Sequence, residues 1–427
     1  MESVGAKAKG THYAYVVLLT SALVALGALG FGRFSYPVIL PAMKQGLNIS
    51  YEQAGLIDSS SSIGYLALSV IAGFVASRFG PRKVISVSMA LLGVSLIGTG
   101  FAPDFFMALV MRILTGIGSG GSNVPVMALA SAWFASSKRG LASGVITGGI
   151  GMGLFISGIA VPGIISGNGL AGWRYAWYFL GALVLLISLI SFALLRNRPQ
   201  EMGLAPVGEP ASPHVSPAAT SNGQGHLQSA KGIYRMPVLW HLAFIYVLFG
   251  FSYITYSTFF AAYLTREGGL TAAAAGSLWA LAGLLSVVSG SIWGMVSDIW
   301  GRKYGLALVF LVQAISFFTF AAVPNAYAFY ASAILFGLTA WSIPAIMAAA
   351  CGDYGGPRLA PAVLGSITLF FGIGQALGPA VGGRIADVTG SFAPAFFLAA
   401  AASTLGALAS LVLRPQESKQ QLRGVIR

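Results

Sequence analysis

Long apolar stretches recur along the whole of this 427-residue chain, and they limit its fold more than any other feature. Only 8% of the residues are charged and 56% are hydrophobic, whereas about a quarter of the residues of a soluble domain are charged. A helix needs about 20 apolar residues to cross a bilayer. We predict an all-α integral membrane protein. Its twelve expected spans are residues 13–42, 51–77, 83–102, 105–133, 139–163, 173–196, 237–265, 272–297, 303–323, 327–350, 359–387 and 391–413.

A short basic hairpin occurs at corresponding places in the two halves of this pattern. The first copy reads Gly-Phe-Val-Ala-Ser-Arg-Phe-Gly-Pro-Arg-Lys from Gly73 to Lys83. The second reads Gly-Met-Val-Ser-Asp-Ile-Trp-Gly-Arg-Lys from Gly294 to Lys303. Such an internal repeat predicts two pseudo-symmetric six-helix bundles, an architecture that in transporters rocks about a central site.

A polar segment separates the two predicted bundles. Residues 197–236 are rich in Pro, Gly and Ser, which favours a flexible linker rather than a packed domain. We therefore divide the chain into a bundle at 1–196, a linker at 197–236, and a second bundle with a short tail at 237–427.

The net charge of +13 is unevenly distributed. If the N-terminus is cytoplasmic, most Lys and Arg residues fall in the inner loops and termini, which is the positive-inside bias and places both termini in the cytoplasm. We therefore expect a multi-pass protein of a bacterial cytoplasmic membrane that contacts lipid and functions as a monomer. No base-reading groups accompany the basic residues, so nucleic-acid binding is not expected.

Three motifs resemble those of the major facilitator superfamily. The hairpin resembles its Gly-xxx-Asp-xx-Gly-Arg-Arg/Lys element, the segment from Arg112 to Gly120 its Arg-xxx-Gly-x-Gly-x-Gly element, and the segment from Gly374 to Gly383 its Gly-Pro-xx-Gly-Gly element. Together they cover both halves of the chain and imply the twelve-helix fold of that superfamily. The resemblance also implies gating roles for Gly73, Gly80, Arg82, Asp298, Gly301, Arg302, Lys303, Gly378 and Pro379.

This chain departs from the hairpin pattern at one position. Ser77 stands where the superfamily has an aspartate, whereas the second copy keeps Asp298. A hydroxyl carries no charge, so we expect a weaker latch in the first half. The segment from Gly30 to Pro37, with Pro41 and Met43 after it, further resembles permeases of magnetosome membranes (the MamH type).

Three ionisable residues fall inside predicted spans, where a charge is costly enough to suggest function. Arg33, Asp58 and Arg112 all lie at similar depth in the outer half of their helices, given a rise of 1.5 Å per residue. One interpretation is an ion pair of Asp58 with either arginine that only joins helices. The other is that Arg33 and Arg112 hold an anion, because two arginines and one aspartate leave one positive charge unbalanced. Asp58 would then alternate between pairing and protonation, which could couple transport to a proton gradient.

The second half offers aromatic rather than charged side chains. Tyr246, Tyr253, Tyr256 and Tyr263 recur along one predicted helix, and packing explains such a stripe more often than binding does. With Tyr65 from the first half, Tyr253 and Tyr256 are the expected substrate contacts. Trp341, Thr368 and Gln375 are weaker candidates.

These observations favour a secondary active transporter of a small solute, and an organic anion above all. Two alternatives stay open. The first is iron, free or chelated, which the magnetosome resemblance suggests although only Asp58 could serve as a charged metal ligand in the membrane. The second is a non-transporting sensor or scaffold with the same fold. No nucleophile and base, metal cluster or cofactor motif is present, so we expect neither an enzyme nor a cofactor.

Overall fold

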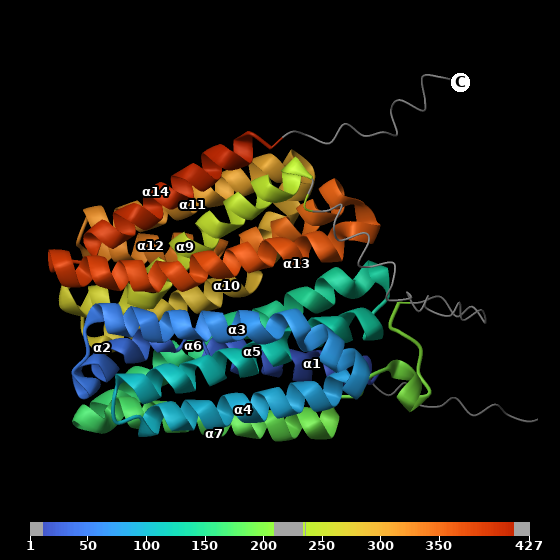
Figure 1. The fold of residues 1–427 in the computed structure, drawn as a ribbon, viewed down its shortest axis with the longest axis horizontal. Coiled ribbons are helices and arrows are strands. Elements are labelled where there is room, and N and C mark those ends of the chain that lie inside the picture. The colour runs from blue at the N-terminus through green and yellow to red at the C-terminus, as the bar shows by residue number, and fades with distance from the viewer. Residues whose placement is uncertain (1–11, 209–233, 235, 414–427) are drawn as a thin grey trace, which may run out of the picture.

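Two helical bundles make up the protein. The computed structural model describes residues 12–208, 234 and 236–413. Most of the predicted linker and the terminal tails lie outside these residues. Helices coloured blue to green form the N-terminal bundle, and those coloured yellow to red form the C-terminal bundle (Figure 1).

The N-terminal bundle comprises α1 (Ala14–Ala25), the π-helical segment η1 (Leu26–Phe31), α2 (Tyr36–Leu47), α3 (Tyr51–Phe79), α4 (Pro81–Phe101), α5 (Phe105–Trp133), α6 (Ser136–Gly167) and α7 (Gly172–Leu194). The C-terminal bundle comprises α9 (Pro237–Arg266), α10 (Ala272–Trp300), α11 (Arg302–Ala322), α12 (Ala326–Thr339), α13 (Ser342–Thr389) and α14 (Ala393–Leu411). Two short 3-10 turns, η2 (Gly169–Ala171) and η3 (Pro199–Met202), complete the helical elements.

The membrane spans agree with the predicted fold class. Within the described ranges, eleven helical segments are long and apolar enough to cross a membrane, and the bent α3 makes a twelfth. This confirms the prediction of an all-α membrane protein with twelve spans. Several bounds, such as Phe105–Trp133, coincide with the predicted ones.

The first span is broken in its middle, although the sequence predicted a continuous helix. Between η1 and α2, residues 32–35 form turns rather than α-helix. Pro37 contributes to the break because it has no N–H to donate to the carbonyl of Arg33, four residues earlier. The break leaves carbonyl oxygens for other helices: Arg112 donates to Gly32 O at 2.5 Å, and Trp279 Nε1 donates to Phe34 O at 2.8 Å.

The tenth and eleventh spans lie close to where they were predicted, at Ala326–Tyr354 and Ala362–Thr389, but the helices that form them differ from the expected ones. Instead of two helices at 327–350 and 359–387, the chain breaks at residues 340–341 and then continues as the single helix α13. Pro344 explains the position of the break, because it cannot donate to the carbonyl of Ala340. The connection between the two spans is therefore helical.

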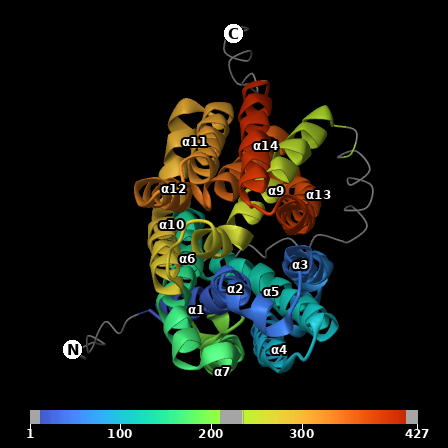
Figure 2. The same ribbon diagram turned by 90° about the vertical axis from the view of Figure 1, so that its left-hand side faces the viewer.

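The bundles meet along two pairs of helices, α6 with α10 and α3 with α13 (Figure 2). Small residues permit the first contact: a Cβ on Gly158 would lie against the carbonyl oxygen of Gly276, and one on Gly283 would lie against that of Gly151. Close backbone approach at small residues is how helices associate in membranes.

The two ends of the molecule differ. We call the end that carries the connections at 48–50, 102–104 and 390–392 the closed end, because residues of both bundles touch there. The other end, which carries the two basic hairpins, is called the open end.

Part of the predicted linker is folded. Val207 pairs with the end of α5: its N–H donates to Trp133 O at 2.9 Å, and its carbonyl accepts from Ala135 N at 3.0 Å. Residues 197–208 thus belong to the N-terminal bundle rather than to a free tether.

Candidate functional site

A cavity of about 560 Å³ lies between the bundles. It extends from Arg33 and Phe34 at mid-depth to Gly140 and Leu364 toward the open end. Both bundles line it, as expected for a central site in this architecture. Its polar and aromatic lining residues are Arg33, Phe34, Tyr65, Asn123, Ser143, Thr147, Tyr246, Tyr253, Ser286, Ser291, Trp341, Thr368, Phe371 and Gln375.

Arg33 is the only charged residue that lines this cavity among the residues the structure describes. The broken first span places it there. Its NH1 group donates to Gln375 Oε1 of the opposite bundle at 3.0 Å, its NH2 group donates to Ser62 Oγ at 2.7 Å, and its Nε atom has no partner. The side chain is buried and has only neutral acceptors. The geometry therefore leaves a positive charge without a counter-ion.

Asp58 and Arg112 form an ion pair behind the cavity. Arg112 NH2 lies 3.7 Å from Asp58 Oδ1, and both residues are buried. The rings of Tyr36 and Trp177 cover the Arg112 guanidinium at 5.1 and 5.3 Å. Arg112 does not line the cavity, so the expectation that it faces the substrate beside Arg33 is not met in this conformation. The physical reason is that Arg112 points toward Asp58 and the carbonyl freed by the helix break.

Asp58 also connects the two bundles. Thr258 of α9 donates its hydroxyl to Asp58 Oδ2 at 2.5 Å. The carboxylate thus contacts one cation in its own bundle and one hydroxyl in the other. Asp58 therefore takes part in a contact between the bundles.

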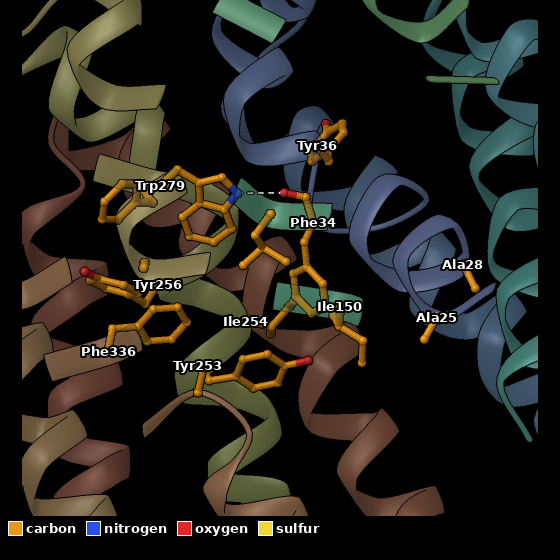
Figure 3. Close-up of a cluster of buried hydrophobic side chains, with 14 of the residues drawn as sticks. Ala25, Ala28, Phe34, Tyr36, Ile150, Tyr253, Ile254, Tyr256, Trp279 and Phe336 are labelled. Carbon is orange, nitrogen blue, oxygen red and sulfur yellow. Dashed lines mark hydrogen bonds between the residues drawn. The ribbon is translucent and has the colours of Figure 1, made fainter. Parts of the chain in front are cut away.

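The tyrosines of α9 divide between the cavity and the bundle interior. Tyr246 and Tyr253 line the cavity, whereas Tyr256 packs among phenylalanines and bonds Ser332 at 2.7 Å. In Figure 3 the Tyr253 hydroxyl points toward Phe34, while the Tyr256 hydroxyl points the opposite way. At about 100° per residue, Tyr253 is rotated about 20° from Tyr246 and Tyr256 about 80°. The prediction of Tyr256 as a substrate contact is thus not supported.

Tyr65 of α3, one of the expected substrate contacts, also lines the cavity. Its hydroxyl accepts from Asn123 Nδ2 at 3.1 Å, and the Asn123 Oδ1 atom has no protein partner. Gln375 was a minor candidate, yet it bonds both Arg33 and Tyr253, to whose hydroxyl its Nε2 donates at 2.6 Å.

The closed end is held by a carboxylate that the sequence analysis missed. Asp387, near the end of α13, accepts hydrogen bonds from the backbone N–H groups of Tyr51 at 3.0 Å and Glu52 at 2.7 Å. These groups start α3, where backbone donors lack helical partners and the helix dipole favours a negative charge. Arg384 adds an ion pair with Glu52 at 2.9 Å. One bundle therefore caps a helix of the other.

The second basic hairpin holds an ion-pair network at the open end. Arg302 contacts Asp298 and also donates through Nε to Asp353 at 2.7 Å and through NH1 to Ser297 at 2.8 Å. Lys303 lies 4.6 Å from the ring of Tyr304. Asp353, which sequence analysis did not identify, joins the hairpin to α13.

The first hairpin has different contacts. Ser77 donates to Phe74 O in its own helix, and Arg82 donates to Phe192 O at 2.7 Å. Gly80, like Gly301 in the second copy, has a positive φ, 85° and 91° respectively, a conformation that favours glycine. Gly73 has open space around it.

Gly378 and Pro379 lie in contact regions of α13. A Cβ on Gly378 would meet Phe251 O and the side chains of Ile254 and Thr255 of α9, while the carbonyl of Pro379 faces Gly55 of α3. Both residues thus help α13 approach its neighbours. No group of three or more His, Cys, Asp or Glu side chains within the described ranges could hold a metal ion.

Comparison with known proteins identifies the family. Residues 25–411 match the family model described as "Uncharacterised MFS-type transporter YbfB". The chain belongs to this family of the major facilitator superfamily. It is a multi-pass membrane transporter and not an enzyme.

Two named relatives are similar to this chain over most of their length. The chain is 27% identical to the "Probable sulfoacetate transporter SauU" of Cupriavidus necator over 405 residues, which cover 90% of each protein. It is 26% identical to the "Hexuronate transporter" of Bacillus subtilis, covering 88% of this chain and 89% of the relative. These comparisons lend no support to the narrower resemblance to magnetosome permeases.

A solved structure has the same fold. The inward-facing, unoccupied bacterial homologue of the human lysosomal transporter Spinster superposes with a TM-score of 0.72 at 16% identity, covering 96% of this chain and 100% of that one.

Proposed function

We propose that this protein is a secondary active transporter of a small organic anion that binds at Arg33. The observation that carries this proposal is the charge balance of the cavity: among the residues that the structure describes, Arg33 alone is charged in its lining, and its hydrogen-bond partners Gln375 and Ser62 are neutral. A guanidinium removed from water is costly unless it is paired. Its planar fork suits carboxylate or sulfonate groups, which it can grip through two hydrogen bonds.

The attraction between the Arg33 guanidinium and an anion is large enough to support a role in binding. Two unit charges 4 Å apart attract by about 4 kcal/mol at an effective dielectric constant of 20. That corresponds to a factor of several hundred to a thousand in affinity, since about 1.4 kcal/mol is tenfold. The named relatives, a probable sulfoacetate transporter and a hexuronate transporter, also act on organic anions.

The basic hairpins indicate which side of the membrane the cavity faces. Arg78, Arg82 and Lys83 lie at the open end with Arg302 and Lys303, so the positive-inside rule assigns that end to the cytoplasm. We therefore assign the structure to the inward-open state of a protein in a bacterial cytoplasmic membrane, with both termini in the cytoplasm. The two bundles, with residues 197–208 belonging to the N-terminal one, would rock to open the closed end.

Proton coupling through Asp58 is part of the proposal. Protonation would remove its charge from the pair with Arg112 and weaken its contact with Thr258. Because Thr258 belongs to the other bundle, this step would favour opening of the closed end.

Iron is the less supported alternative. Within the described part of the chain, the cavity carries an arginine and no other charged side chain, so it repels a bare cation. Sites for hard metal cations need several oxygen ligands. Uptake of ⁵⁵Fe by proteoliposomes in the absence of a chelator would favour this alternative.

Transport by reconstituted protein tests the proposal. Proteoliposomes should take up labelled hexuronate or short sulfonates, Arg33→Gln should reduce the uptake at least 100-fold, and Arg33→Lys should restore only part of it. Arg174→Gln is the matched control, because Arg174 donates to the carbonyls of Gly100 and Ala102 outside the cavity. Equal losses for Arg33→Gln and Arg174→Gln would refute the proposal, and binding without flux would favour a sensor.

A further inference from the structure

We propose that the neutral amide of Gln375 takes the place of the substrate anion at Arg33. We also propose that the cavity selects anions with a single negative charge. This inference rests on the proposed function and narrows the class of substrate. It follows from three observations: the charges buried in the membrane core, the partners of Arg33, and the neutral character of the remaining cavity lining.

The first observation is the balance of buried charge. Among the described residues, the buried charged side chains are Arg33, Asp58 and Arg112. Asp58 and Arg112 neutralise each other at 3.7 Å and do not line the cavity. One positive charge is left, at Arg33. One monovalent anion is therefore sufficient to neutralise the core.

The second observation is how Arg33 is held in the structure. Gln375 belongs to the opposite bundle, and its Oε1 atom accepts from Arg33 while its Nε2 atom donates to Tyr253 Oη. These two partners fix the amide, since the reverse orientation would place an NH₂ group against the guanidinium. A neutral oxygen is a weaker acceptor for a guanidinium than a carboxylate or sulfonate oxygen. An anion can therefore replace Gln375 at Arg33.

The third observation concerns the rest of the cavity. Tyr65, Asn123, Thr147, Trp341 and Thr368 offer polar atoms without a positive charge. A volume of about 560 Å³ would also admit dianions of similar size, so size does not select against them. A second negative charge would lack a counter-ion once the bundles close and exclude water, and an unpaired charge in a dry site is costly.

Binding of matched ligands to the wild-type protein tests the selectivity. At pH 7.5, isethionate and sulfoacetate share a two-carbon skeleton but carry one and two negative charges, as do glucuronate and glucarate on a six-carbon skeleton. In at least one pair the monoanion should bind 10-fold or more tightly than the dianion. Dianions that bind as tightly or more tightly would overturn the inference and leave the proposed function intact. If no member of either pair binds, both are overturned.

Substitution of Gln375 tests whether its amide takes the place of the anion at Arg33. Gln375→Glu supplies a permanent carboxylate at nearly unchanged shape and should reduce binding of the preferred monoanion at least 100-fold. Gln53→Glu is the matched control, because it makes the same change outside the cavity, at the start of α3, where the Gln53 Oε1 atom accepts from Ser50 N at 3.0 Å. It should reduce binding less than 10-fold. Equal losses in the two variants, at equal thermal stability, would show that Gln375 has no special relation to Arg33.

Discussion

The cap that Asp387 supplies to α3 yields a quantitative prediction about the conformational equilibrium. The contact joins the bundles only at the closed end, through two backbone hydrogen bonds of 3.0 and 2.7 Å. If the closed end opens, Asp387 and the start of α3 separate. The substitution Asp387→Ala should therefore destabilise the inward-open state and leave the outward-open state nearly unchanged.

The expected size follows from helix capping. Loss of a capping side chain costs about 0.5–2 kcal/mol, and we take ~1 kcal/mol because Asp387 is exposed to solvent. An energy of 1 kcal/mol changes an equilibrium constant about fivefold. Asp387→Ala should thus increase the ratio of outward-open to inward-open molecules about fivefold.

Distances between spin labels measure this ratio. Gln45 and Ala272 are exposed at the closed end, one in each bundle, and can carry the labels after substitution by cysteine. The single native cysteine, Cys351, is buried and can be replaced by serine. Asp387→Ala should increase the population of long distances.

A matched control separates this effect from a general loss of helix capping. Asp104 caps α5 within its own bundle by accepting from Met107 N at 2.9 Å. Asp104→Ala should leave the distance distribution unchanged. The reasoning is refuted if the two substitutions shift the distribution equally, or if Asp387→Ala leaves it unchanged.

Three further predictions concern stability and binding. Arg112→Leu leaves the buried Asp58 carboxylate without an ion-pair partner and should lower the free energy of unfolding by about 3 kcal/mol. The midpoint of thermal unfolding in detergent should fall, and the additional substitution Asp58→Asn should largely restore it. No recovery in the double variant would contradict the ion pair. Tyr253→Phe should change anion affinity several-fold because it frees the Gln375 amide, whereas Tyr256→Phe should alter only stability, by ~1 kcal/mol; titration calorimetry compares them. Gly283→Leu should prevent α6 and α10 from packing, which size-exclusion chromatography of the purified protein would report as aggregation; a monodisperse, transport-active variant would contradict it.

Sequence patterns specified the spans well because each span is a local property. A helix of about 20 apolar residues is stable in lipid whatever its neighbours are. Breaks were harder to predict. Pro37 and Pro344 are visible in the sequence, but proline in membrane helices is often accommodated. The break at 32–35 depends on partners such as Arg112 and Trp279. The break at 340–341 depends on partners such as Ser289 and Trp293.

The site could be predicted only in part, because the depth of a residue in the membrane does not tell in which direction its side chain points. Arg33, Asp58 and Arg112 were identified as unusual charges, but which arginine pairs with Asp58 depends on how helices rotate and on the break in the first span. Contacts between the bundles were beyond the sequence patterns. Asp387 lies more than 300 residues from its partners Tyr51 and Glu52, and no local motif marks it.

The central claim is that Arg33 balances the charge of the transported anion. Titration calorimetry of the preferred anion into purified wild-type protein and into Arg33→Gln tests it most directly. We expect at least a 100-fold weaker affinity for Arg33→Gln, with the thermal unfolding midpoint within a few degrees of wild type. Unchanged affinity in a folded Arg33→Gln protein would contradict it.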